Sequence, residues 1–128
     1  MRLLLDTHAY LWFVGGNSTL PVRTATLIAD AEHTRLVSLA SLWEISIKAG
    51  LGKLKLPFGL DELCDDQIVI NGFSPLAIGL EHIKRVVSLP RHHGDPFDRL
   101  LVAQCEAENL ALVSRNPVFD AYGIKRVW

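Results

Sequence analysis

The amino-acid sequence predicts an α/β fold with a mostly parallel central sheet, formed as one domain over residues 1–128. Short apolar runs alternate with stretches of helical periodicity, which is the order of strands and helices in parallel α/β domains. The apolar runs contain few polar residues, as expected for strands that helices cover on both faces. About half of the chain is hydrophobic (49%), which is enough for one core.

The N-terminal part opens with a predicted strand over residues 2–5, which ends at Asp6. A helix follows over residues 8–14 and stops at the glycine pair 15–16, because glycine is favoured at helix ends. A second helix runs from Pro21 to about Ala31, since proline suits the first helical turn. This order already indicates a parallel sheet.

The second predicted strand is the apolar pair 36–37, and a helix follows it to about Ala49. Ser38 or Ser41 is its expected N-cap, because a serine oxygen accepts from the free N–H groups of the first turn. Gly50 ends this helix. The next predicted elements are a loop over 52–57, a weak helix over 60–67, a helical extension or strand over 68–70, and a possible strand over 73–76.

The C-terminal part contains the longest predicted helix, which the run Asp95-Pro96-Phe97-Asp98 opens and which reaches about Glu108. Asp is a favoured N-cap, and proline is favoured at the position that follows it. The other predicted elements are a helix over 80–87 ended by Pro90, a strand over 110–113, a short helical piece over 118–122, and a terminal strand over 125–128.

Charge and cysteine content exclude several functional classes. The net charge of −1 excludes the general electrostatic grip of a strongly basic nucleic-acid binder, though not a local basic patch. The lone cysteines Cys64 and Cys105 form neither a zinc motif nor a disulfide framework, so we expect a reduced, cytoplasmic setting. We expect no membrane partner, because neither a signal-peptide pattern nor a membrane-spanning apolar run is present.

Acidic residues stand where the predicted strands end. Asp6 ends the first strand, Glu44 lies one to two turns into the helix after the second, and Asp98 lies in the first turn before the strand over 110–113. In parallel sheets these positions can meet at one edge, where converging carboxylates repel unless a cation bridges them. Oxygen ligands suit Mg²⁺ or Mn²⁺, and phosphodiester hydrolysis is the natural chemistry of such a site.

Each acid also has a structural explanation. Asp6 could cap the helix that follows it. Glu44 stands three residues after a serine and four before Lys48, spacings that suit a capping box or a helical ion pair. Asp95 is better explained as an N-cap, whereas Asp98 is better assigned to the site, because one cap does not account for two acids.

Four motifs occur in order over residues 2–128. They are Leu-Leu-Asp6-Thr7-His8-Ala-Tyr-Leu-Trp12; Ser-Leu-Trp43-Glu44-Ile-Ser-Ile-Lys48; Leu-Pro90-Arg-His-His93-Gly-Asp95-Pro96-Phe97-Asp98-Arg99 continuing to Gln104; and Leu-Val-Ser114-Arg115-Asn116-Pro-Val-Phe119, followed by the ending Tyr122-Gly123 to Trp128. Together they resemble the PIN domain, and more closely the VapC-like ribonuclease toxins of type II toxin–antitoxin systems.

This resemblance implies a three-layer α/β/α PIN-like fold. It also implies a Mg²⁺- or Mn²⁺-dependent endoribonuclease, usually a homodimer, that a small cognate antitoxin protein inhibits. By motif position the family's three acids fall on Asp6, Glu44 and Asp98, and its hydroxyl residue falls on Ser114. Asn116 departs from the Asp often found there, so we expect one metal ion to bind well and a second to bind weakly.

The predicted roles combine residue chemistry with this resemblance. Asp6 and Asp98 bind the metal, Glu44 binds it or orients the attacking water, and Ser114 and Asn116 hold a carboxylate or a metal-bound water. The expected contacts to RNA phosphate are Arg99, Arg115, Lys48 and His93. The alternatives are a PIN-like DNA- or RNA-processing nuclease without an antitoxin, and a catalytically weakened protein that only binds an antitoxin.

Overall fold

Helices and strands alternate along the chain, and the computed structural model describes residues 1–128. The strands are β1 (Arg2–Leu5), β2 (Thr34–Ser38), β3 (Ser74–Leu76), β4 (Ala111–Val113) and β5 (Arg126–Val127). The helices are α1 (Thr7–Val14), α2 (Val22–Ala29), α3 (Leu39–Gly50), α4 (Leu60–Cys64), α5 (Asp66–Ile70), α6 (Leu80–Val86), α7 (Pro96–Glu108) and the 3₁₀ helix η1 (Pro117–Tyr122).

All five strands are parallel and form one sheet in the order β3-β2-β1-β4-β5. The central strand is β1, whose Leu5 pairs with Val37 of β2 and with Val113 of β4. The chain adds β2 and β3 on one side of β1, then β4 and β5 on the other, so the strand order reverses beside β1. In open parallel sheets, ligands bind at the carboxyl ends of the strands at such a reversal.

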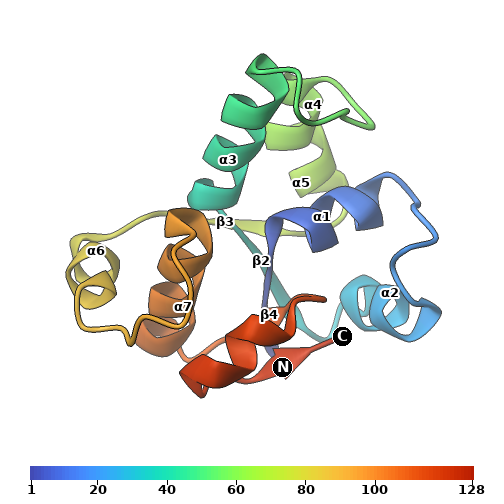
Figure 1. Ribbon diagram of the computed structural model, residues 1–128. Coiled ribbons are helices and arrows are strands. Elements are labelled where there is room, and N and C mark those ends of the chain that lie inside the picture. Colours follow the sequence, from blue (N-terminus) through green and yellow to red (C-terminus); the bar gives the residue numbers. More distant parts are fainter.

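Apolar side chains cover both faces of the sheet. On one face, Leu3 and Leu5 of β1 belong to a core that includes Tyr10 of α1 and Ile28 of α2. On the other face, Leu4 belongs to a second core with residues of α7 and η1. Figure 1 shows α1 and α2 on one side of the strands, and α6 and α7 on the other. This three-layer arrangement confirms the predicted α/β/α fold class.

The segment after α3 differs from the prediction. The helix expected over 60–67 is two short helices, α4 and α5, which are separated at Asp65 (φ −117°, ψ −74°). The stretch 68–70 is helical, because it forms the end of α5. Ser38 rather than Ser41 caps α3, since its Oγ accepts from the Ala40 N–H at 3.0 Å. None of the helices combines the length and the apolar composition that crossing a membrane requires.

Candidate active site

Asp6 directly follows β1 and is tied to the neighbouring strand. Its N–H donates to the Val113 carbonyl at 3.0 Å, beside the reversal in strand order. Its Oδ1 accepts from the Ala9 N–H at 2.9 Å and so caps α1. Asp6 is therefore both a helix cap and an acid at the sheet edge where ligands bind.

A cavity of about 170 Å³ lies at this edge and brings most of the predicted site residues together. It is lined by Asp6, Thr7, His8, Glu44, Lys48, Asp95, Asp98, Asn116 and Phe119. The predicted convergence of three acids is thus present in the geometry, with one acid after β1, one on α3 and one on α7. Ser114 is fully buried and reaches Asp6 through a side-chain hydrogen bond.

Glu44 is held from two sides within this cavity. The Thr7 hydroxyl donates to Oε1 at 2.5 Å, and the Lys48 ammonium donates to Oε2 at 2.5 Å. Glu44 is only 4% exposed, so these bonds replace most of the water that its carboxylate loses. The helical ion pair between Glu44 and Lys48 therefore forms. The capping box does not form, because α3 begins at Leu39 and Ser41 lies inside the helix instead of at its N-cap.

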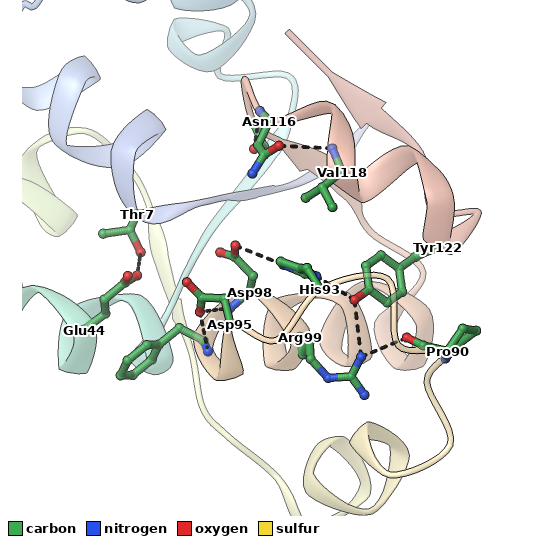
Figure 2. A network of polar contacts seen from close by, with 12 residues as sticks. Thr7, Glu44, Pro90, His93, Asp95, Asp98, Arg99, Asn116, Val118 and Tyr122 are labelled. Carbon is green, nitrogen blue, oxygen red and sulfur yellow. Dashed lines mark hydrogen bonds and ion pairs between the residues drawn. The ribbon is translucent and has the colours of Figure 1, made fainter.

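Asp98 lies at the end of a relay of polar side chains, which Figure 2 shows. Nε2 of His93 lies 3.2 Å from Oδ2 of Asp98, and Nδ1 of His93 lies 2.7 Å from the Tyr122 hydroxyl. With Nε2 protonated, His93 donates to Asp98 and accepts from Tyr122. Arg99 in turn donates to the Tyr122 oxygen at 3.3 Å. Both ring nitrogens of His93 are engaged, so His93 orients Asp98.

Asp95 and Asn116 each cap a helix at the rim of the cavity. Oδ1 of Asp95 accepts from the N–H groups of Phe97 at 2.9 Å and of Asp98 at 3.1 Å, which confirms its predicted role as the N-cap of α7. Oδ1 of Asn116 accepts from the Val118 N–H at 3.1 Å at the start of η1 (Figure 2). The free amide NH₂ of Asn116 therefore contributes polarity to the cavity but no charge.

The acids of the cavity share a crowded and partly desolvated space. Burial raises the pKa of Asp6 above its usual value, and the charge of Glu44 adds to the rise, while hydrogen bonds from Ser114 and the Ala9 N–H oppose it. Burial and the charge of Asp95 raise the pKa of Asp98 to about 6; Asp6 adds to this, and His93 opposes it. Both shifts mean that the cavity disfavours further negative charge.

A divalent cation fits this set of donors. Carboxylate oxygens are the ligands of Mg²⁺ and Mn²⁺, and a cation would stabilise the ionised forms of Asp6 and Asp98, whose pKa values are raised by burial and, to a smaller extent, by neighbouring acids. No three Asp, Glu, His or Cys side chains lie close enough together to form a complete metal-binding site. The arrangement therefore suits an ion shared by Asp6 and Asp98, with Glu44 already bonded to Thr7 and Lys48.

The other predicted phosphate contacts lie outside the cavity. Arg99 is 6% exposed, and its guanidinium donates to the carbonyls of Val86, Leu89 and Pro90 at 2.8–3.3 Å. This structural role replaces the phosphate contact that we expected for Arg99. Arg115 is exposed and borders a neighbouring hollow of about 330 Å³, which also touches Asp6, Asn116, His8, Trp12 and Pro117.

Three contributors to the site were not among the predicted site residues. The Thr7 hydroxyl bonds Glu44. His8 lines the acidic cavity. Tyr122 was taken only as part of a terminal motif, although it holds His93. One feature of the sequence could have indicated Thr7 and His8. They directly follow Asp6, so the first turn of the helix places them near the same end of the strand.

Solved structures with the same fold cover almost the entire chain. A VapBC2 structure from Rickettsia felis, bound to a promoter DNA fragment, matches with a TM-score of 0.72 and 18% identity, covering 99% of this chain and 98% of that one. DNA-bound VapBC from Salmonella typhimurium matches with a TM-score of 0.69 and 16% identity, covering 99% and 97%. A toxin–antitoxin complex from Klebsiella pneumoniae gives a TM-score of 0.63 and 19% identity, covering 98% and 96%.

These identities are too low to show more than a shared fold. No curated protein matches the sequence significantly. The sequence itself, however, matches the model of one protein family from the second residue of β1 to the residue before β5. Because this PIN domain model covers residues 3–125, nearly the whole chain, the protein belongs to the PIN domain family.

Proposed function

We propose that this protein is a divalent-metal-dependent endoribonuclease that acts as the toxin of a toxin–antitoxin pair. The observation that carries the proposal is the convergence of Asp6, Glu44 and Asp98 on one cavity at the reversal in strand order. Membership of the PIN family and the shared fold with a toxin–antitoxin complex support it. Hydrolysis of a phosphodiester suits such a site. A negatively charged phosphate can approach the carboxylates once a cation neutralises the charge of both groups.

In this mechanism Asp6 and Asp98 would hold the ion, Mg²⁺ or Mn²⁺. When bound, the ion would neutralise phosphate charge and lower the pKa of a water molecule. Glu44, fixed by Thr7 and Lys48, accepts a hydrogen bond from the attacking water and directs it at phosphorus. The attacking water gives one proton to Glu44 as its oxygen bonds to phosphorus, the bond from phosphorus to the leaving ribose oxygen breaks, and that oxygen takes up a proton from solvent. No covalent enzyme intermediate is involved.

Arg115 and Lys48 are the proposed contacts to RNA phosphates on either side of the acids. Lys48 lines the acidic cavity, and Arg115 borders the hollow that adjoins it. Asp6 and Asn116 line both spaces, so a strand crossing from one to the other passes the acids. Single-stranded RNA suits this path, because its unpaired bases are accessible. His93 and Ser114 act as positioning residues for Asp98 and Asp6.

The proposed partners are RNA as substrate, a cognate antitoxin and a second copy of the chain. The resemblance to VapC-like toxins motivates all three, and the shared fold with VapBC proteins supports an antitoxin partner. Identifying the gene immediately upstream and co-expressing its product tests this part: a small protein that forms a stable complex and blocks cleavage is the expected result. A cytoplasmic location accompanies this proposal.

The direct test is cleavage of a panel of single-stranded RNA and matched single-stranded DNA with Mg²⁺ or Mn²⁺. We expect RNA to be cut, EDTA to stop cleavage, and Asp6→Asn to lower the rate by at least about 100-fold, since one carboxylate ligand is lost. Asn keeps the cap of α1, so the variant is expected to fold. Asp61→Asn, at an exposed site in α4, is the matched control. Cleavage by Asp6→Asn at the native rate, or of DNA alone, contradicts the proposal.

A further inference from the structure

Lys48 lines the acidic cavity, although its side chain is partly exposed to solvent. It lies one helical turn after Glu44 on α3, and its side chain is 38% exposed while that of Glu44 is 6% exposed. Its ammonium is 2.5 Å from Oε2 of Glu44. Lys48 is also the only lysine or arginine that lines the acidic cavity. The cavity therefore contains one built-in positive charge.

The charge of Lys48 interacts with acids other than its hydrogen-bond partner Glu44. The hydrogen bond to Glu44 raises the pKa of Lys48, and the charges of Asp95 and Asp98 raise it further. Asp98 lies on α7 and Asp95 is the N-cap of that helix, whereas Lys48 lies on α3. The positive charge of Lys48 therefore interacts favourably with Glu44 on α3 and with Asp98 on α7.

Two further observations limit the number of metal ions. Both oxygens of Glu44 already accept hydrogen bonds, from Thr7 and from Lys48. Asn116 supplies an amide at the rim instead of a carboxylate. Asp6, Glu44, Asp95 and Asp98 bring four carboxylates to the cavity, and the ion pair with Lys48 neutralises the charge of Glu44. A second divalent ion would meet the ammonium group.

We propose that Lys48 is the second cation of this site: it takes the place of a second metal ion, holds Glu44, and offers its remaining N–H groups to the phosphate of the substrate. This inference rests on the proposed nuclease function for its last part only. An ammonium group has three donors, of which Glu44 uses one, so two remain for phosphate oxygens. Lys48 then stabilises the charge that develops on the phosphate as its bond breaks.

Calorimetric titration of the metal-free protein with Mn²⁺ tests the cation role without any substrate. We expect the native chain to bind one ion, and Lys48→Met to bind Mn²⁺ about tenfold more tightly or to bind two ions, because a repelling charge is gone and Glu44 is freed. Lys48→Arg keeps the charge and is expected to titrate like the native chain. Lys53→Met, at an exposed lysine beyond α3, is the matched control. Unchanged or weaker binding by Lys48→Met overturns the proposal.

The Lys48→Met variant leaves Glu44 buried without its counter-ion, so its folding must be followed as well. We expect Mn²⁺ to raise its melting temperature more than that of the native chain; a smaller rise counts against the proposal, even if the metal-free variant is unfolded. In the RNA assay we expect Lys48→Met to lose about 100-fold in rate and Lys48→Arg to recover most of it. A native chain that cuts no RNA refutes the nuclease proposal, whereas the Mn²⁺ titration still decides the cation role.

Discussion

Arg99 shows how the environment of one residue decides its role. Its place beside Asp98 in a nuclease-like motif suggested a contact to RNA phosphate. In the fold it is buried and donates to three backbone carbonyls between α6 and α7 and to the Tyr122 hydroxyl. Guanidinium is suited to this task, because its planar fork presents five donors in fixed directions. Arg99 therefore joins the loop before α7 to the relay that orients Asp98.

Replacing Arg99 by Met should lower the free energy of unfolding by about 2–4 kcal/mol, since buried carbonyls lose their charged donor. Arg99→Lys should be intermediate, because one ammonium cannot reach all of these acceptors. Urea denaturation followed by circular dichroism measures both values. Arg91→Met is the matched control at an exposed arginine in the preceding loop, and it should change stability by less than about 0.5 kcal/mol. Equal stability of Arg99→Met and the native chain would contradict the structural role.

At the scale of elements, local chemistry predicted the fold well where a signal lies within a few residues. The apolar runs became strands, and the run that begins at Asp95 and Pro96 became the start of α7. The break between α4 and α5 had no such signal, because Asp65 stands among helix-compatible residues and no glycine or proline marks the break. The choice between Ser38 and Ser41 as cap also depended on where β2 ends against β1.

The cap of α7 can be separated from the charge of its residue. Asp95→Ala should lower the free energy of unfolding by about 1 kcal/mol, because the N–H groups of Phe97 and Asp98 lose their acceptor. Asp95→Asn should cost less, since an amide oxygen caps a helix equally well and one repelling charge near Asp98 disappears. Thermal and urea unfolding of the two variants make the comparison. An equal loss for Asn and for Ala would show that the charge, not the cap, is what α7 needs.

At the scale of the whole molecule, the cavity is assembled from segments that are distant in sequence. The acids Asp6, Glu44 and Asp98 were predictable, because each stands beside a strand end and parallel strands share an edge. The partners of these acids were not predictable. Whether Thr7 bonds Asp6 or Glu44, and whether His93 faces solvent or Asp98, depends on how α3 and α7 approach the sheet. These contacts depend on distances between elements in the folded chain, and the spacing of residues along the sequence does not predict those distances.

In the proposed function, this assembly would link metal binding to the stability of the entire fold. The pKa of Asp98 is raised to about 6, above its value in an unfolded chain, so its ionised form is disfavoured in the metal-free native state. The resulting loss of native-state stability is complete above pH 6. It decreases as the pH falls below the pKa of Asp98 in the native state, and it vanishes below the pKa of Asp98 in the unfolded chain. In EDTA at pH 8, Asp98→Asn should therefore melt at or above the temperature of the native chain, and this advantage should shrink toward pH 4. The titratable groups that face Asp98 are Asp95, Asp6, His93 and Lys48.

Metal should reverse that order. An ion held by Asp6 and Asp98 joins the end of β1 to the start of α7, and binding at 100 times Kd stabilises the native state by about 2.7 kcal/mol, or roughly 10 °C in a chain of this size. We expect saturating Mn²⁺ at pH 8 to raise the melting temperature of the native chain above that of Asp98→Asn, whose own shift should be small. Asp61→Asn should shift like the native chain. If Asp98→Asn gains as much from Mn²⁺ as the native chain does, Asp98 is not a ligand and the ion binds elsewhere.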